Sequence, residues 1–189
     1  MKYGVILARF QPVHCGHLAL IKKAYEENDK VLLLVGSADK INARNPIPLN
    51  IRMDMLKDAL TEYQLIDKCI IYPLDDLSTE SDNSIDWGFY LYSQVVDIIK
   101  DSAFTMYYSD GFEIITTWFP GFILRNYVSL VLLARGKVQK GISATQVRNL
   151  ILNYDKDDST LKELFDVTPE SVFSRKEMLK AFININKER

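Results

Sequence analysis

The only two histidines of this 189-residue chain, His14 and His17, lie three positions apart in the segment RFQPVHCGH, residues 9–17. At the start of a helix, side chains three positions apart share one face, so both imidazoles can contact one ligand. A helix N-terminus also offers unpaired backbone N–H groups and the positive end of the helix dipole. Gly16 allows a ligand to approach the backbone closely. The segment therefore predicts a phosphate-binding turn.

Two other interpretations of this turn stay open. A histidine is often structural, and two histidines three positions apart can also begin a metal site. The sequence places no third metal ligand nearby, because Cys15 would point in a different direction from the histidines. The residues of the turn alone do not decide among these interpretations.

A second candidate anion site lies far along the chain, in the segment GISATQVR, residues 141–148. Ser143 is a typical N-cap for a helix that starts near Ala144. The N–H groups of the first turn, the Thr145 hydroxyl and Arg148 would then surround an anion. Arginine suits this role because its charge is permanent and its forked donors match phosphate oxygens. A capped helix with one arginine is common. This segment therefore indicates an anion site only in combination with the histidine turn.

Short apolar runs alternate with stretches of helical periodicity along most of the chain. The runs predict buried strands over residues 3–8, 30–36, 68–74, 103–108 and 128–134. The periodic stretches predict helices over residues 16–27, 49–63 and 87–100. This alternation predicts an α/β fold with a parallel sheet covered on both faces. Ligands of such sheets bind beyond the carboxyl ends of the strands, where the histidine turn is expected to lie.

The tail of the chain differs from this pattern. Residues 153–159 are polar and suggest a linker, and two short helices are expected after it. Thr168-Pro169-Glu170 suggests an N-cap, a proline at the first helical position and an acid in the first turn. Ser174 with Glu177 fits a capping box, and the apolar stripe of the second helix consists of Met178, Leu179, Phe182 and Ile183. We therefore expect a main domain over residues 1–152. We expect residues 153–189 to form a C-terminal helical extension that packs on it and has no chemistry of its own.

Charge and cysteine usage restrict the class of protein. The formal net charge is −2, which argues against a general nucleic-acid-binding protein but allows a local positive cluster for a small anion. Cys15 and Cys69 form no disulfide framework, and the start of the chain shows no secretory signal. The run over residues 128–134 is too short to span a bilayer. We expect a cytoplasmic protein without nucleic-acid or membrane partners.

The combination of HCGH, residues 14–17, with ISATQVR, residues 142–148, resembles the HxGH nucleotidyltransferase superfamily. Its motifs are (T/R)-F-x-P-x-H-x-G-H and I-S-x-T-x-(I/V)-R, and this sequence matches nearly all of both. The resemblance covers about residues 2–152. It implies a Rossmann-like doubly wound parallel sheet of the HUP/nucleotidyltransferase type, followed by short C-terminal helices.

Several segments resemble the archaeal-type nicotinamide-nucleotide adenylyltransferases in particular. They are RFQP at residues 9–12, NPIP at residues 45–48 with Arg52 and Met55, YPLDD at residues 72–76, Trp87, and YSD at residues 108–110. The chain departs from the family pattern at Ala8, where glycine is usual, before Arg52, where an acidic residue is frequent, and in the loop at residues 110–113. These departures leave the reaction class intact and bear on the identity of the acceptor.

The resemblance implies that AMP is transferred from ATP, carried with Mg²⁺, to nicotinamide mononucleotide (NMN), giving NAD and pyrophosphate. The implied catalytic residues are His14, His17 and Arg148. The implied ATP contacts are Arg9, Phe10, Gln11, Gly16, Ser143, Ala144 and Thr145. The implied acceptor contacts are Trp87, Arg52 and Lys40, and no metal site made by protein residues alone is expected.

Some parts of this interpretation keep alternatives. For Lys40 and Arg44 a solvated loop is equally compatible, and for Trp87 a place in the core. The acceptor could instead be nicotinate mononucleotide, phosphopantetheine, FMN or, with CTP, an alcohol phosphate. A non-catalytic nucleotide sensor would carry the same motifs. Many relatives form dimers to hexamers, so a homo-oligomer is compatible with the resemblance.

Overall fold

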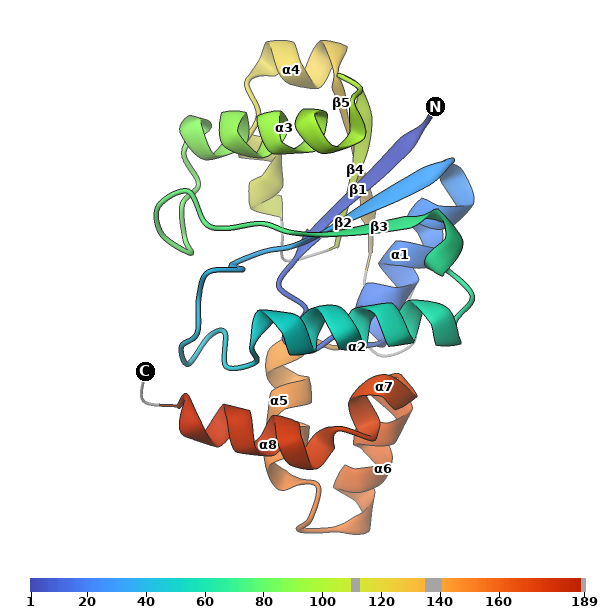
Figure 1. The fold of residues 1–189 in the computed structure, drawn as a ribbon, viewed down its shortest axis with the longest axis vertical. Coiled ribbons are helices and arrows are strands. Elements are labelled where there is room, and N and C mark those ends of the chain that lie inside the picture. Colours follow the sequence, from blue (N-terminus) through green and yellow to red (C-terminus); the bar gives the residue numbers. More distant parts are fainter. Residues whose placement is uncertain (110–112, 135–140, 188–189) are drawn as a thin grey trace.

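The structure is a computed structural model that describes residues 1–109, 113–134 and 141–187. Within these ranges five strands form one parallel sheet in the order β3-β2-β1-β4-β5 (Figure 1). The strands are β1 (Tyr3–Ala8), β2 (Lys30–Val35), β3 (Cys69–Pro73), β4 (Phe104–Ser109) and β5 (Val128–Leu133). The first four helices are α1 (Cys15–Glu27), α2 (Leu49–Glu62), α3 (Ile85–Ile99) and α4 (Gly121–Asn126). The 3-10 helices are η1 (Ile66–Lys68) and η2 (Glu113–Thr117), and the last helices are α5 (Ala144–Asn153), α6 (Asp158–Val167), α7 (Glu170–Phe173) and α8 (Lys176–Ile185).

The strand order confirms the doubly wound α/β prediction. The chain builds the sheet outward from β1 to β3 and then crosses to β4 on the other side of β1. Because all pairings are parallel, Ala8 lies beside Val35, and Val35 beside Pro73, so the loops that follow these strands leave from one edge. The direction of winding reverses between β1 and β4, and this is where ligands of doubly wound sheets bind.

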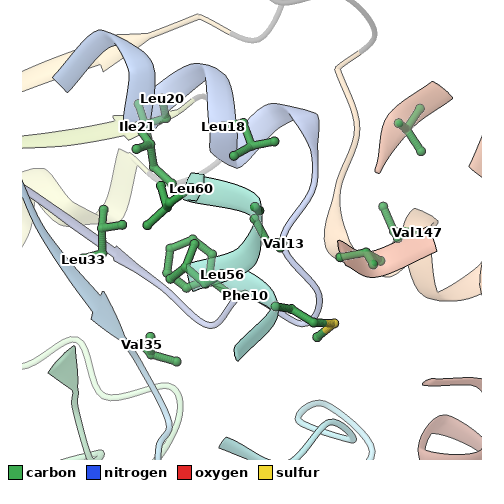
Figure 2. Packing of buried hydrophobic residues seen from close by; sticks show 14 of the residues in the cluster. Phe10, Val13, Leu18, Leu20, Ile21, Leu33, Val35, Leu56, Leu60 and Val147 are labelled. Carbon is green, nitrogen blue, oxygen red and sulfur yellow. The ribbon is translucent and has the colours of Figure 1, made fainter. Parts of the chain in front are cut away.

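Alternate residues of the central strands enter two separate cores. Val31, Leu33 and Val35 of β2 pack on the side of α1 and α2, whereas Leu32 and Leu34 pack on the side of α3 and α4. All five are fully buried, which explains why β2 is an unbroken apolar run instead of an alternating one. Figure 2 shows the first core, where Phe10 and Val13 of the turn after β1 lie among side chains of α1 and α2.

The C-terminal segment forms three helices in place of the two that the sequence predicted. The polar residues that suggested a linker include the start of α6, because the Asp157 side chain accepts a hydrogen bond from the backbone N–H of Thr160 at 2.7 Å and caps this helix. Leu164, Val172 and Leu179 of the tail are fully buried in the same core as α1 and α2. The division of the chain near residue 152 stays a prediction.

The predicted capping of the tail helices is wrong. Pro169 is the N-cap of α7 instead of its first residue, and α8 starts after Arg175 without a side-chain cap. The Ser174 hydroxyl is not free for a capping box, since it donates to the carbonyl of Glu170 at 2.7 Å. Tertiary packing of the apolar stripe, not capping, therefore supports α8.

Residues 113–126 hold two short helices, η2 and α4, that the sequence did not indicate. Trp118 and Phe119 between them are buried in the second core. Gly88 of α3 makes this packing possible, because a Cβ atom there would lie 1.8 Å from the Trp118 carbonyl oxygen. No helix within the described ranges combines the length and apolar character needed to cross a bilayer.

Candidate active site

A cavity of about 430 Å³ opens at the carboxyl ends of β1 and β4, at the point where the winding reverses. Its walls bring together both predicted phosphate motifs. Residues that line it include Arg9, Phe10, Gln11, His17, Arg44, Tyr108, Ser109, Ala144, Thr145 and Arg148. A neighbouring cavity of about 130 Å³ shares His17 and Ala144 with it and adds His14, Gly16 and Ser143. The structure therefore brings the two motifs to one site, as the sequence predicted.

The two histidines lie on one face at the start of α1. His14 is the N-cap residue, and its Nδ1 accepts a hydrogen bond from the backbone N–H of Gly16 at 3.1 Å. The rings of His14 and His17 are 3.9 Å apart and inclined by 31°. Because Nδ1 of His14 is an acceptor, a neutral ring carries its proton on Nε2, which can then donate to an anion.

Gly16 serves this arrangement in a way that the sequence did not predict. A Cβ atom at residue 16 would lie 3.0 Å from Cε1 and 3.1 Å from Nδ1 of the His14 ring. Such distances are closer than ordinary van der Waals contact, so any larger residue would push the imidazole away. The glycine thus makes room for the His14 ring beside the backbone.

Phe10 and Gln11 hold the turn in place through their side chains. Phe10 is buried and adopts a left-handed backbone conformation with φ of +50°, which is unusual for a residue other than glycine. The Gln11 amide donates to the Ile47 carbonyl at 3.1 Å and accepts from the Ile47 N–H at 2.9 Å. Since both side chains are occupied inside the protein, any contact of these residues with ATP would come from the backbone.

The start of α5 is capped as the sequence predicted. Ser143 and Gln146 form a capping box, in which the Ser143 hydroxyl accepts from the Gln146 N–H and the Gln146 side chain accepts from the Ser143 N–H. Arg148 donates from Nη1 to the Gln11 carbonyl at 2.9 Å and from Nη2 to the Thr145 hydroxyl at 3.1 Å. Arg148 therefore joins motifs that lie 137 positions apart.

Arg9 and Arg44 at the wall of this cavity both lie close to Glu80, which lines a smaller cavity together with Arg9. Oε2 of Glu80 lies 3.8 Å from Nη1 of Arg9 and 3.6 Å from Nε of Arg44. Burial lowers the pKa of Arg9, and the nearby charge of Arg44 lowers it further, while Glu80 acts in the opposite direction. Glu80 was not predicted from the sequence, where nothing distinguishes it from the other acidic residues of its loop.

Arg52 is placed differently from the acceptor contact that the resemblance implied. Its side chain is fully buried and donates to the carbonyls of Arg9 at 2.9 Å, Gly36 at 2.8 Å and Ser37 at 3.0 Å. Burial lowers the pKa of its guanidinium to about 10. A fully buried guanidinium with three carbonyl partners ties the loops after β1 and β2 together and does not face a ligand.

Trp87 belongs to the second core and also lines a smaller cavity of about 110 Å³. Arg9, Asp76 and Trp118 are among the other residues that line this cavity, and the Trp118 ring meets the Trp87 ring edge-on at 5.8 Å. The Trp87 indole Nε1 is buried and has no hydrogen-bond partner within the described ranges of the chain. Both interpretations of Trp87, as a core residue and as part of an acceptor site, are compatible with this position.

The remaining predicted site residues are Lys40 and those of the loop after β4. Lys40 is paired with the neighbouring carboxylate of Asp39, whose hydrogen bond raises the lysine pKa. Its acceptor contact stays a prediction. Of the segment at residues 108–110, Tyr108 and Ser109 line the main cavity, and Asp110 lies outside the described residues.

The described residues contain no group of three or more His, Cys, Asp or Glu side chains that could hold a metal ion. Mg²⁺ usually keeps several waters and binds through substrate phosphates with one or two carboxylates, so a metal delivered with a nucleotide would not need such a group.

Comparison with known proteins assigns the α/β region of the chain to a family. Residues 5–150 match the model of the cytidylyltransferase-like family, which covers more than half of the chain. The chain belongs to this family. Both phosphate motifs of this cytidylyltransferase-like protein lie within the matched range, and most of the tail lies outside it.

Two archaeal relatives illustrate the similarity in sequence. The nicotinamide-nucleotide adenylyltransferase of Thermococcus kodakarensis is 36% identical over 97 residues, which is 50% of this chain and 50% of the relative. That of Pyrococcus furiosus is 38% identical over 81 residues, covering 41% of this chain and 43% of the relative. The matched region therefore spans half or less of these curated relatives.

The fold is shared with solved structures of lower sequence identity. A bifunctional NMN adenylyltransferase/ADP ribose pyrophosphatase from Francisella tularensis, complexed with AMP and a manganese ion, superposes with a TM-score of 0.63. The two are 23% identical, and the match covers 80% of this chain and 42% of that one. This likeness supports the architecture of the cytidylyltransferase-like domain.

Proposed function

We propose that this cytidylyltransferase-like protein transfers AMP from ATP to NMN and so forms NAD and pyrophosphate. The observation that carries the proposal is the Arg148 side chain, which connects the histidine turn with the start of α5 beside one cavity. The names of the archaeal relatives support the choice of NMN as acceptor. The cysteine usage supports a cytoplasmic location. We also propose that the protein can form a homo-oligomer.

The reaction makes modest chemical demands on the protein. An oxygen of the NMN phosphate attacks the α-phosphorus of ATP, the bond from this phosphorus to the bridging α,β-oxygen breaks, and pyrophosphate leaves with the bonding electrons. The attacking oxygen is already anionic at neutral pH, so no general base is required. Catalysis then consists of alignment and of stabilising charge on the phosphoryl oxygens.

The residues at the cavity fit these two tasks. We assign the Nε2–H of His14 and the ring of His17 to the α- and β-phosphates. Arg148 and Thr145, together with N–H groups at the start of α5, are assigned to the β- and γ-phosphates, where the helix dipole also favours negative charge. Arg9 lines both the main cavity and the smaller one, and can contact a phosphate at their junction.

The smaller cavity is proposed as the site of the nicotinamide ring. Trp87 and Trp118 provide aromatic walls, and a cationic pyridinium gains cation–π attraction on an indole face. The buried Nε1 of Trp87 offers an unused donor at this cavity. Mg²⁺ would enter with ATP and neutralise part of the triphosphate charge, held mainly by phosphate oxygens.

An acceptor panel tests the proposal. The protein is supplied with ATP or CTP and, in turn, with NMN, nicotinate mononucleotide, phosphopantetheine, FMN or an alcohol phosphate, and pyrophosphate release is recorded. We expect ATP with NMN to give the highest kcat/KM. A panel in which NMN is the poorest acceptor contradicts the assignment of the substrate, and nucleotide binding without any pyrophosphate release indicates a sensor.

The role of His17 gives the first mutational prediction. His17→Ala removes a hydrogen-bond donor that stabilises the negative charge developing in the transition state. We therefore expect kcat to fall by about 10²–10³-fold. The far-UV circular dichroism spectrum should stay that of the wild type. Lys22→Ala, on the exposed part of the same helix, is the matched control and should keep full activity. Full activity of His17→Ala would contradict the mechanism.

A further inference from the structure

The carboxylate of Glu80 lies between two arginines that line the main cavity. Glu80 belongs to the loop between β3 and α3, Arg9 follows β1, and Arg44 belongs to the loop between β2 and α2. One oxygen, Oε2, stands at ion-pair distance from both guanidinium groups, and the Glu80 side chain is only 11% exposed. Three loops at the carboxyl edge of the sheet thus meet at the carboxylate of Glu80, and Asp76 adds a second negative charge near Arg9.

The hydrogen bonding of this carboxylate is incomplete. Oε1 accepts a hydrogen bond from the side-chain amide of Asn42, whereas Oε2 is buried and finds no hydrogen-bond donor among the residues that the structure describes. The distances of 3.6 and 3.8 Å to the arginines exceed hydrogen-bond length. A strong arginine–carboxylate pair is bidentate, and a buried oxygen without a donor carries a desolvation penalty. The contact is therefore electrostatically favourable but readily exchanged.

The two arginines need an anion whether or not substrate is present. Their like charges repel each other, and Arg44 is a cause of the lowered pKa of Arg9. Arg44 also donates to the hydroxyl of Ser81 at 3.3 Å, which keeps it against the loop that carries Glu80. A phosphate brings more oxygens and more charge than a carboxylate, so it can satisfy the forked donors that Glu80 leaves unused.

We propose that Glu80 is an internal counter-anion, which holds Arg9 and Arg44 at the cavity in the free protein and is replaced there by a substrate phosphate. Glu80 is then a positioning residue that tunes affinity and does not take part in the chemistry. An entering group must compete with a carboxylate that is already present, so the site favours phosphate over singly charged carboxylates. The inference rests on the proposed function only in taking the anion to be a phosphate of ATP or of the mononucleotide.

Binding measurements on Glu80→Gln test this proposal. Glutamine keeps the size of the side chain and an oxygen for Asn42 but removes the charge. By isothermal titration calorimetry we expect the Kd for tripolyphosphate to fall about three- to tenfold, because the competitor for the arginines is gone. Asp75→Asn is the matched control, since Asp75 is an exposed acid of the same loop and the net charge changes equally. Its Kd should stay near that of the wild type.

Two further ligands identify the source of the phosphate. Tighter binding of a non-hydrolysable ATP analogue alone assigns the exchange to the triphosphate, and tighter binding of NMN alone assigns it to the acceptor phosphate. Tightening for both supports a shared position.

An unchanged or weaker Kd for all three ligands in Glu80→Gln would overturn the proposal. Glu80→Ala serves as a second variant and should also tighten binding, whereas a merely structural role predicts weaker binding. The assay measures no turnover, so its outcome is separate from that of the acceptor panel.

Discussion

The guanidinium of Arg52 shows how a single side chain can set the shape of the site without touching a ligand. It brings a positive charge into a fully buried position, where the carbonyls of three residues stand in for water. The carbonyls belong to Arg9, Gly36 and Ser37, directly after β1 and β2. Arg52 therefore fixes the backbone from which Arg9 reaches the cavity.

Removal of this side chain should destabilise the whole protein. Arg52→Ala leaves three carbonyls without their donor, and breaking buried charged hydrogen bonds of this kind lowers the free energy of unfolding by about 3–5 kcal/mol. Arg52→Lys keeps the charge but has one donor nitrogen, so a smaller loss is expected. Urea unfolding measures both. Arg125→Ala, at an exposed position of α4, should change stability by less than about 0.5 kcal/mol, and an equally small effect at residue 52 would contradict this role.

The sequence could predict residues whose role follows from residue type and spacing. His14, His17, Ser143 and Arg148 belong to this group: their place at the cavities follows from the helix starts on which they lie, and their contacts with a ligand stay a prediction. The roles of Gln11, Arg52 and Glu80 could not be predicted in this way. Each depends on the path of a loop that is distant in sequence, and an isolated motif holds no information on that path.

The loop between β2 and α2 is an element supported from two sides. Its residue Ile47 is held by the Gln11 side chain, and the Pro46 carbonyl accepts a hydrogen bond from the Asn186 amide at 3.1 Å. Asn186 follows α8 and is only 3% exposed. The C-terminal helices thereby contact the loop that carries Arg44, although the sequence suggested no role for them in the site.

A substitution at this contact should affect substrate affinity more than turnover. Asn186→Ala removes the donor to Pro46, so the loop with Arg44 should become less ordered. We expect KM for ATP or NMN to rise about three- to tenfold with kcat within about twofold of the wild type, as measured by steady-state kinetics. Asn153→Ala is the control, because the Asn153 amide donates to the Asn149 carbonyl within the same helix, α5. Equal effects of the two substitutions would argue against a coupling through Pro46.

At the scale of elements, the prediction of strands was accurate and that of the tail was not. Each of the five strands was expected within about one residue of its observed bounds, because each is marked by a short, mainly apolar run. The central strand β2 is buried on both faces and is a continuous apolar run, whereas the edge strands β3 and β5 are partly exposed. The first turn of α6 is polar and acidic, which stabilises a helix N-terminus but resembles a linker in composition. The short helices η2 and α4 are fixed by the packing of Trp118 and Phe119, which no local pattern reveals.

At the scale of the whole molecule, the partly buried thiol of Cys69 links stability to pH. Burial raises the pKa of Cys69 to about 12 from its ordinary value of 9.0. The unfolded thiol therefore ionises first, and above pH 9 the unfolded state binds fewer protons than the folded state. The free energy of unfolding contributed by this group is fully present below pH 9 and is lost as the pH rises toward 12.

Comparison of the wild type with Cys69→Ser isolates this effect. Serine does not titrate in this range, so the difference in the free energy of unfolding between the two proteins should shrink or reverse as the pH rises from 8 to 10.5. Urea unfolding at a series of pH values measures the difference, and the titration of other groups cancels in it. Parallel stability curves for the two proteins would show that the folded thiol titrates normally.

The hydrogen bond from Arg148 to the Gln11 carbonyl links the stability of the fold to nucleotide binding. The proposed nucleotide site forms when two parts of the chain 137 positions apart are folded together. ATP would then bind the folded chain and not the unfolded one, and a ligand at a hundred times its Kd adds about 2.7 kcal/mol to stability. The supply of nucleotide would therefore help to set how long the folded protein resists unfolding and proteolysis.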